Sequence, residues 1–411
     1  MAHYTVLLKK NTHINGWVHM HLLKAVYSLM ESFAYVLRRA GAVVVVLYLV
    51  FLVVFKIKYP FWAKQPVFHF HNIYYWIRPP GIIDHSPPKR TKFFDAAIYF
   101  DKITNTSKTK KKEFVRLVQR HYMHRKGTDY SPSARSILSY LDNTKSYIGM
   151  KYENNQLIGT ITGRPLLCFI DGNNIVINYV DFLCVKKENR KQGIAPKLIY
   201  TYMVRQREAI TMNHVFIFKR ETATTFIVPL CCYMTYGFSL KYMHQPVPMV
   251  GAVRFVRLVS KQLDLIYRYQ APFQKEFRCV IFPPYGHLAH LIDSGSIVVY
   301  AVIDGTNAYA FYFFRKTDTT IDGDRVIESL GSFCNCKNNM DLFIQGFLNA
   351  VSAESKTVKA GTLVIENLSH NSLLLKSYML TNTVQFKSPT SYYFYNFAYH
   401  PFESRDVLIV S

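Results

Sequence analysis

Apolar residues follow one another without a charge from Gly41 to Phe55, a run of fifteen positions rich in valine and leucine. Basic residues flank this run on both sides, namely Arg38, Arg39, Lys56 and Lys58. Fifteen residues make roughly 23 Å of α-helix. Flanking basic side chains can reach the headgroups and complete a hydrocarbon core of ~30 Å. The pattern predicts one transmembrane helix over about residues 40–57.

The residues before this run, from Trp17 to Leu37, place apolar side chains at helical spacing and predict an amphipathic helix. Such a helix fits a membrane surface or ordinary packing. A cleaved signal peptide fits poorly, because the apolar run starts forty residues into the chain and no small-residue cleavage site follows. A buried, valine-rich strand or a core helix is the alternative to a membrane span.

Residues 59–92 are rich in proline, histidine and aromatic side chains and predict an extended arm. Beyond the arm, short apolar stretches alternate with turn residues. Helices are expected at 113–124 and, after an N-cap at Ser131, up to Leu141. Strands are expected at 147–152, 156–161, 166–170 and 175–185, followed by a helix at 195–209, a strand at 214–218, a helix-containing segment at 222–236 and a strand at 238–242.

A proline-rich stretch at 245–251 predicts a boundary between two halves. The second half repeats the order of hairpin, helix, strand, helix and strand. Its helices are expected at 259–269, 341–353 and 371–379, and its strands at 297–303, 308–315, 362–366, 392–397 and 407–410. The predicted organisation is therefore an N-terminal segment (1–58), a first half (59–245) and a second half (246–411).

The stretch from Asn178 to Tyr202 predicts a buried strand, a basic loop and a helix. Small residues at the junction, around Gly193, let a ligand approach the backbone, and Pro196 suits the first turn of a helix. A helix N-terminus offers free N–H groups and a positive dipole end to phosphate. The pattern predicts a pyrophosphate cradle; a solvated basic loop is the alternative.

The loop and helix have the spacing R-x-x-G-x-A, and Tyr233 begins a Y-x-x-x-G-F sequence one helix and one strand later. This order resembles the acyl-CoA motifs of the GNAT acyltransferases. Within them, DFLCV at 181–185, followed by Arg190 and Ala195-Pro196, looks like the N-myristoyltransferase signature. The segments FWAKQPV (61–67) and YYFYNF (392–397) resemble that family's entry and C-terminal motifs. The resemblance runs in order from about residue 59 to 411.

This resemblance implies an α/β (α+β) fold with tandem GNAT-like N-acyltransferase domains: a mixed, mostly antiparallel sheet flanked by helices, here with an N-terminal transmembrane helix. It implies an oxyanion hole made by the main chain of Phe182 and Leu183 at a strand bulge. Residues expected at the acyl-CoA are Phe61, Trp62, Gln65, Cys184, Val185, Arg190, Lys191, Gln192, Gly193, Ile194, Ala195 and Pro196. Residues expected at the acceptor substrate are Asp181, Tyr233 and Asn396.

The family uses a buried C-terminal carboxylate as the base, which implies that role for Ser411; an ordinary edge strand is the alternative. Several positions depart from the family. Asp181 replaces an asparagine, so that its carboxylate could serve as the base or compete with it. Pro60 replaces a basic residue. The loop at 123–129, MHRKGTD, lacks the family's acidic cluster. Features on the CoA side are therefore better preserved than those on the peptide side.

The net charge and the cysteine spacing limit the kinds of partner and metal site that the chain is expected to have. The formal net charge is +24, which implies phosphate groups, an anionic membrane or nucleic acid. The basic residues are spread along the chain without a nucleic-acid motif, and this disfavours nucleic acid. Seven cysteines without disulfide or zinc spacing predict reduced thiols in a cytosol-facing domain. No metal site is expected, His69-x-His71 included.

The sequence therefore predicts a monomeric, single-pass membrane protein with a cytosolic catalytic domain, because acyl-CoA is cytosolic. The expected enzyme is a glycylpeptide N-acyltransferase of lipoprotein biosynthesis. It uses myristoyl-CoA as co-substrate, no permanent cofactor, and an N-terminal-glycine peptide or protein as acceptor. Two alternatives stay open: a GNAT-type acyltransferase for another amine, and an inactive acyl-CoA-binding membrane protein.

Overall fold

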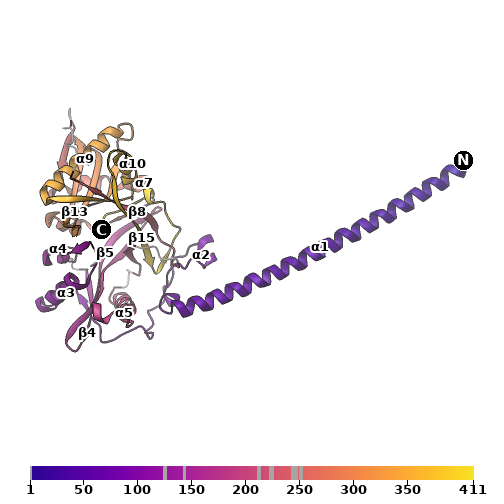
Figure 1. Ribbon diagram of the computed structural model, residues 1–411, viewed down its shortest axis with the longest axis horizontal. Coiled ribbons are helices and arrows are strands. Elements are labelled where there is room, and N and C mark those ends of the chain that lie inside the picture. Colours follow the sequence, from indigo (N-terminus) through magenta and orange to yellow (C-terminus); the bar gives the residue numbers. More distant parts are fainter. Residues whose placement is uncertain are drawn as a thin grey trace. The chain divides into compact units, whose positions relative to one another are not determined.

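A computed structural model describes residues 2–123, 127–141, 145–210, 214–221, 226–241, 249 and 253–411. The chain forms two compact units, residues 1–64 and 65–411. The first unit consists of one continuous helix, α1 (Ala2–Lys58), and the short 3-10 helix η1 (Trp62–Lys64) (Figure 1). The two predicted helical stretches are thus joined, because a single Gly41 costs a helix only about 1 kcal/mol.

Within α1, Tyr27–Lys58 contains an 18-residue window with a mean hydropathy of 2.7, and it is the one segment among the described residues that is long and apolar enough to cross a membrane. This segment contains the predicted span at about 40–57. By length and composition it satisfies the requirement for a bilayer-crossing helix.

The second unit is built on strands, which are β1 (Gly81–Ile82), β2 (Tyr99–Lys102), β3 (Thr128–Tyr130), β4 (Tyr147–Glu153), β5 (Gln156–Ile170), β6 (Asn173–Val185), β7 (Phe216–Arg220), β8 (Cys231–Ser239), β9 (Arg254–Arg257), β10 (Cys279–Phe282), β11 (Ile297–Asp304), β12 (Asn307–Ile321), β13 (Asp324–Cys334), β14 (Ala360–Glu366), β15 (Val384–Tyr395), β16 (Phe397–Ala398) and β17 (Val407–Ile409). In the described part of the chain, one large sheet has the order β17-β10-β5-β6-β7-β15-β8-β14-β13-β12-β11-β9. Neighbours are antiparallel except β6·β7, β10·β17 and β13·β14.

The described helices of the second unit are α2 (Ile73–Ile77), α3 (Lys108–His121), α4 (Ala134–Ser139), α5 (Ile194–Ala209), α6 (Leu263–Arg268), α7 (Gln270–Glu276), α8 (Tyr285–Asp293), α9 (Met340–Val358) and α10 (Asn371–Thr381). On β4, Ile148 and Met150 share a core with α3, while Gly149 faces Tyr202 of α5. Because neighbouring residues of a strand point to opposite faces, α3 and α5 lie on opposite faces. Helices α9 and α10 pack on β13 and β14 (Figure 1).

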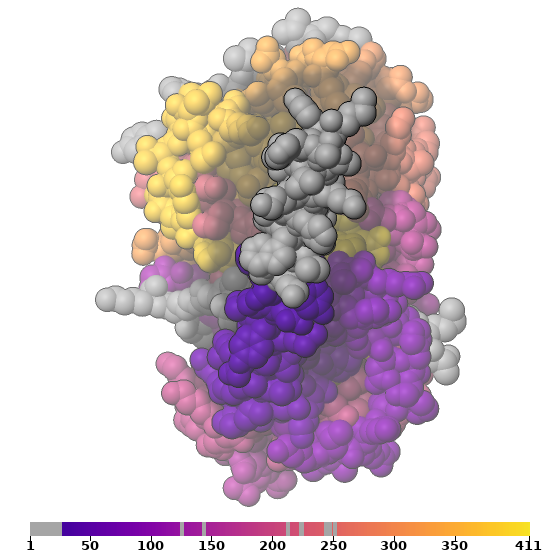
Figure 2. Space-filling model, turned by 90° about the vertical axis from the view of Figure 1, so that its right-hand side faces the viewer, coloured from indigo at the N-terminus to yellow at the C-terminus, as the bar shows by residue number. Residues whose placement is uncertain are grey.

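The two halves meet within the sheet rather than at its edge. Strand β15, from the C-terminal part of the chain, pairs with β7 on one side and with β8 on the other. Strand β10 pairs with β5. On the surface in Figure 2, purple residues gather in the lower part of the view and orange and yellow residues in the upper part, whereas pink residues from the middle of the chain appear in both. The predicted α/β architecture with a mostly antiparallel sheet and flanking helices is confirmed.

Several local expectations were wrong. The N-cap before α4 is Ser133 and not Ser131, since the Ser133 side chain accepts the N–H of Ser136 at 3.0 Å. The two strands expected between 156 and 170 are one, β5. The described residues of the expected helical segment 222–236 hold strand β8 instead, and residues 222–225 lie outside the described part. Strand β13 was not predicted. The predicted boundary at 245–251 falls largely outside the described residues.

Candidate active site

Strand β6 carries a bulge at Phe182 and Leu183. Thr160 of β5 pairs with Cys184 and Thr162 pairs with Asp181, so two residues of β6 face the single residue Ile161. Phe182 has a φ of 47°, which belongs to the left-handed region. A bulge disrupts the hydrogen-bond ladder locally and re-aims main-chain groups. The bulge lies where the resemblance implies an oxyanion hole, and the Phe182 side chain is buried beside Phe114 of α3.

The same strand has an open edge beside the bulge. Strands β6 and β7 pair in parallel only at Asn178↔Phe216 and Tyr179↔Ile217. Among the described residues, no strand pairs with this edge of β6 beyond Tyr179. An unpaired strand edge presents N–H and C=O groups to an extended ligand, which can bind as an additional strand.

The loop after β6 leads into an uncapped helix. Gly193 is the N-cap residue of α5 with a φ of 76°, and no side chain caps the first N–H groups. Lys191 is also left-handed, with a φ of 65°. Successive N–H groups in such turns form anion-binding concavities, and the helix dipole adds to their effect. The loop residues Lys191, Gln192 and Gly193 are exposed, so that a phosphate can reach them.

Arg190 holds this loop in place. Its Nε donates to the carbonyl of Val185 at 3.1 Å, and its Nη2 donates to the carbonyl of His121 at 2.6 Å. The guanidinium therefore ties the loop to the end of α3. Its charge stays close to the N-terminus of α5, although two of its donors are used by the protein itself.

We expect Gly193→Ala to weaken acyl-CoA binding by roughly 5- to 30-fold, because a left-handed conformation costs a non-glycine residue about 1–2 kcal/mol. No heavy atom lies within 4 Å of the added Cβ, so the effect would come from the backbone alone. Isothermal titration with acyl-CoA measures it.

Gly172→Ala is the matched control, because Gly172 also has positive φ and open space but lies in the β5–β6 turn. Equal affinity losses for both variants would contradict a specific role for Gly193.

Asp181 precedes the bulge and contacts it. Its Oδ1 accepts the main-chain N–H of Phe182 at 2.7 Å and the hydroxyl of Tyr122 at 3.2 Å. Its Oδ2 lies 3.4 Å from Nη1 of Arg164, and its side chain is 24 % exposed. One N–H of the expected oxyanion hole is therefore bonded to the neighbouring carboxylate.

Arg164 is an unusual residue at this place because its side chain is only 1 % exposed. Its guanidinium stacks over the rings of Tyr179 at 4.6 Å and Tyr140 at 4.9 Å. Burial raises the pKa of Tyr122 well above its ordinary value, and the charge of Asp181 raises it further. Tyr122 is thus a neutral donor to Asp181 at all physiological pH values.

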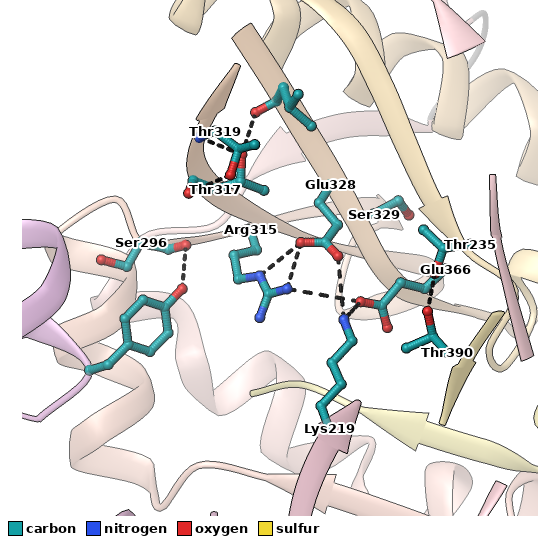
Figure 3. Close-up of polar contacts among 12 residues, drawn as sticks. Lys219, Thr235, Ser296, Arg315, Thr317, Thr319, Glu328, Ser329, Glu366 and Thr390 are labelled. Atoms are coloured by element: carbon teal, nitrogen blue, oxygen red, sulfur yellow. Dashed lines mark hydrogen bonds and ion pairs between the residues drawn. The ribbon is translucent and has the colours of Figure 1, made fainter. Parts of the chain in front are cut away.

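A second group of charges, which we call the four-charge cluster, consists of Lys219, Arg315, Glu328 and Glu366 (Figure 3). Arg315 of β12 donates to Oε2 of Glu328 through Nε at 2.9 Å and Nη2 at 2.6 Å. Lys219 of β7 lies 3.5 Å from Oε1 of Glu328 and donates to Glu366. The hydroxyl of Tyr233 donates to Oε2 of Glu366 at 2.8 Å.

The two acids of the cluster titrate differently. Burial raises the pKa of Glu366 to about 7, despite the neighbouring Lys219. Burial alone would also raise the pKa of Glu328, but the charges of Arg315 and Lys219 outweigh it and hold that pKa well below its ordinary value. Glu328 is thus the permanently ionised partner, and Glu366 is the group that takes up a proton near neutrality.

Tyr179 connects the two groups of charges. Burial raises its pKa, and the charges of Asp181, Lys219 and Arg164 act on its hydroxyl. The bulge, Asp181 and the four-charge cluster therefore belong to one polar centre inside an otherwise apolar sheet. Sequence reasoning missed Arg164, Lys219, Arg315, Glu328 and Glu366. Each is a charged residue within a mostly apolar strand, and this pattern is the signal that could have revealed them.

The remaining expected residues lie elsewhere or have structural partners. Gln65 is buried and accepts the hydroxyl of Tyr395 at 2.7 Å. Phe61 and Trp62 lie in the first unit with their rings 5.0 Å apart. Asn396 accepts the N–H of Asp84 and donates to the carbonyls of Asp84 and His214, which fixes the arm to the sheet. Its role at the acceptor stays a prediction.

Ser411 follows β17 and is 1 % exposed. The N–H of Val410 donates to the carbonyl of Ile281 at 2.9 Å, which continues the β10·β17 pairing. Figure 1 places the C-terminus inside the second unit. Cys184 is likewise buried, and burial raises the pKa of its thiol to about 12.

Comparisons with known proteins bear on the family and the fold. Residues 83–221 match the family model of the N-terminal domain of myristoyl-CoA:protein N-myristoyltransferase. Two crystal structures of Saccharomyces cerevisiae N-myristoyltransferase with bound myristoyl-CoA have TM-scores of 0.67 and 0.69, each with 14 % identity over 86 % of this chain and 99 % or 94 % of theirs. No curated protein sequence matches the chain significantly. Over residues 83–221 the chain matches the N-terminal domain of the N-myristoyltransferase family, it has the fold of these enzymes, and together these findings indicate an acyltransferase.

Proposed function

We propose that the protein transfers a long acyl chain, myristoyl in the first instance, from acyl-CoA to the N-terminal glycine amine of a peptide or protein at a membrane. One observation carries this proposal: the bulge, the open edge of β6 and the uncapped N-terminus of α5 follow one another along a single stretch of chain. The phosphates bind at Lys191–Ala195, the pantetheine amides lie along the open edge, and the thioester carbonyl reaches the bulge.

The reaction then needs a polarised carbonyl and a base. The amine nitrogen attacks the thioester carbonyl, and the N–H groups of Phe182 and Leu183 bind the oxyanion that forms. The C–S bond breaks, the CoA thiolate leaves, and the amine proton passes to a carboxylate. No covalent enzyme intermediate is needed.

Two carboxylates are candidates for the base. The C-terminal carboxylate at Ser411 is the one that the resemblance implies, and burial of Ser411 supports it. Asp181 has the more direct geometry, because it already contacts the bulge. We assign the base to Asp181. When its Oδ1 gains the amine proton, it no longer accepts the Phe182 N–H so strongly, and this donor becomes available to the oxyanion.

The acceptor is expected to differ in charge from a basic peptide. The cations Lys219 and Arg315 do not decide this charge, because they are paired with Glu366 and Glu328. The loop at 123–129, in contrast, has basic residues in the sequence and lacks an acidic cluster. An acceptor rich in lysine or arginine would meet like charge, so neutral or acidic residues after the glycine are favoured.

The test is thiol release from myristoyl-CoA by the full chain in detergent, with an N-terminal-glycine peptide and with its N-acetylated twin. Release that requires the free amine supports N-acyl transfer. Release with lysine or small amines but not with glycine peptides would indicate a GNAT-type enzyme for another acceptor. Acyl-CoA binding without release for any acceptor would replace the proposal with a binding protein.

Membrane attachment is a separate part of the proposal and rests on the segment Tyr27–Lys58. Deleting residues 1–58 is expected to move the protein from the membrane fraction to the soluble fraction after a high-salt wash, with acyl transfer retained. Ultracentrifugation and thiol release measure both. A truncated protein that still requires detergent for extraction would show that α1 is not the only anchor.

A further inference from the structure

Exposed apolar side chains of the second unit gather in one short segment. Of twelve large hydrophobic side chains that are exposed among the described residues after α1, five lie between positions 70 and 77. They are Phe70, Ile73, Tyr74, Trp76 and Ile77, which are 46 %, 68 %, 61 %, 42 % and 77 % exposed. Exposed apolar residues usually occur singly, and a contiguous group marks an interaction site.

The segment is held in place by its own contacts. The indole N–H of Trp76 donates to the carbonyl of Phe70 at 2.8 Å. The rings of Trp76 and Tyr75 lie 5.1 Å and 5.7 Å from that of Phe68, which is buried. The N–H of Phe70 donates to the carbonyl of Phe226 at 3.2 Å. The apolar side chains are therefore presented by an anchored platform, in which α2 is the outer element (Figure 1).

Composition and charge favour a lipid surface as the partner. Tyrosine and tryptophan next to isoleucine are the residues that proteins place at the membrane–water interface. On the side of the span that leads to the second unit, no acidic residue occurs between Lys56 and Asp84, whereas four basic residues do: Lys56, Lys58, Lys64 and Arg78. This stretch is thus complementary to anionic headgroups.

The length of the connection between α1 and Phe70 is compatible with a contact between residues 70–77 and the bilayer that α1 would cross. The apolar helix ends at Lys58, and Phe70 follows twelve residues later. Even a fully extended connection of this length spans at most about 43 Å. If α1 crosses a bilayer, the platform can reach the surface of that bilayer without any further linker.

We propose that residues 70–77 form a second membrane contact, with the side chains of Phe70, Ile73, Tyr74, Trp76 and Ile77 inserted into the interfacial layer of an anionic membrane. This inference rests on the proposed membrane attachment and adds to it: the span tethers the protein, and the platform sets how the second unit meets the lipid. Acyl-CoA and the acylated product both partition to that surface.

The chain offers a built-in probe, because it has three tryptophans, Trp17, Trp62 and Trp76. The full-length protein with Trp17→Phe and Trp62→Phe keeps only Trp76. It is reconstituted into vesicles of phosphatidylcholine and phosphatidylserine whose acyl chains carry bromine near the headgroup. We expect at least a twofold quenching of Trp76 emission by these lipids, together with protection from aqueous iodide.

Two further variants sharpen the result. Ile73→Ser with Ile77→Ser in the same background is expected to reduce the bromolipid quenching and restore iodide access. Met379→Ser with Leu380→Ser changes two other exposed apolar residues at the end of α10. This variant is expected to leave the bromolipid quenching and the protection from iodide unchanged. Far-UV circular dichroism confirms that each variant is folded.

The remaining outcomes overturn the inference. Vesicle-bound protein in which iodide but not bromolipid quenches Trp76 would show that the platform faces water. Protection from iodide without bromolipid quenching would mean that a second copy or another part of the protein covers it. Protein that fails to sediment with vesicles at all would instead refute membrane attachment. Acyl transfer is measured separately in detergent, so neither the quenching result nor the sedimentation result decides the proposed acyltransferase activity.

Discussion

Asp181→Asn is expected to lower kcat for acyl transfer by about 10²- to 10⁴-fold, the usual contribution of a general base. Asparagine has nearly the same shape and can still accept from Tyr122 and Phe182, but it cannot take the amine proton. Acyl-CoA affinity should be unchanged, because the phosphate loop at 191–195 is separate from Asp181 in the chain. Stopped-flow thiol release and titration with acyl-CoA separate the two quantities.

Tyr122→Phe is the matched control for this variant. It removes one hydrogen bond to Asp181 without removing the carboxylate, so its kcat should fall by about tenfold or less. A chain with one residue added after Ser411 tests the other carboxylate. Full activity in Asp181→Asn, with activity lost in the extended chain, would assign the base to Ser411 and refute the role given to Asp181.

Glu328→Gln is expected to destabilise the second unit by about 3–5 kcal/mol, because it leaves Arg315 buried without its ionised partner. Glu366→Gln should cost much less, since Glu366 can carry a proton in the folded state and glutamine still accepts from Tyr233. The midpoints of thermal unfolding in detergent, compared at pH 6, measure the difference. Equal decreases of the unfolding midpoint in the two variants would contradict the assignment of Glu328 as the ionised partner and of Glu366 as the group that takes up a proton.

The pKa of Glu366 also predicts how the stability of the second unit changes with pH. The pKa of Glu366 is about 7 in the folded protein and 4.5 for the free side chain. The folded state therefore binds this proton more tightly, and the stability that it contributes at low pH is lost as the pH rises from about 4.5 through 7. Glu366→Gln should become more stable relative to the parent protein over this window.

Local signals explain what the sequence could predict. Strand β6, its loop and helix α5 were predicted within a few residues because apolar alternation, charge and Gly193 act over short distances. Strand β8 was mistaken for part of a helical segment because CCYMTYGF has no period-2 alternation of apolar and polar residues. Its strand conformation is imposed by pairing with β14 and β15, which are far away in the chain.

The candidate site residues divide in the same way. The sequence could point to Phe182 and Gly193, because the bulge and the helix N-terminus depend on the main chain near them, and their roles at the acyl-CoA stay predictions. Each residue of the four-charge cluster could be noticed as a charge within a mostly apolar strand, but their meeting could not be predicted, because Lys219, Arg315, Glu328 and Glu366 come from four different strands whose neighbours are set by the sheet order. No single-sequence pattern indicates that these particular charges meet.

The position of β15 between β7 and β8 has a consequence for biosynthesis. A ribosome that has completed the first eight strands has not yet made the strand that joins two of them, because β15 begins at Val384. Until β15 is synthesised, the edges of β7 and β8 that it pairs with stay exposed. Exposed strand edges of this kind are prone to aggregation and are the reason that chaperones are needed. Contacts between positions so far apart also slow folding. We therefore expect chains that stop before β15 to be degraded in cells rather than to accumulate as a stable N-terminal half.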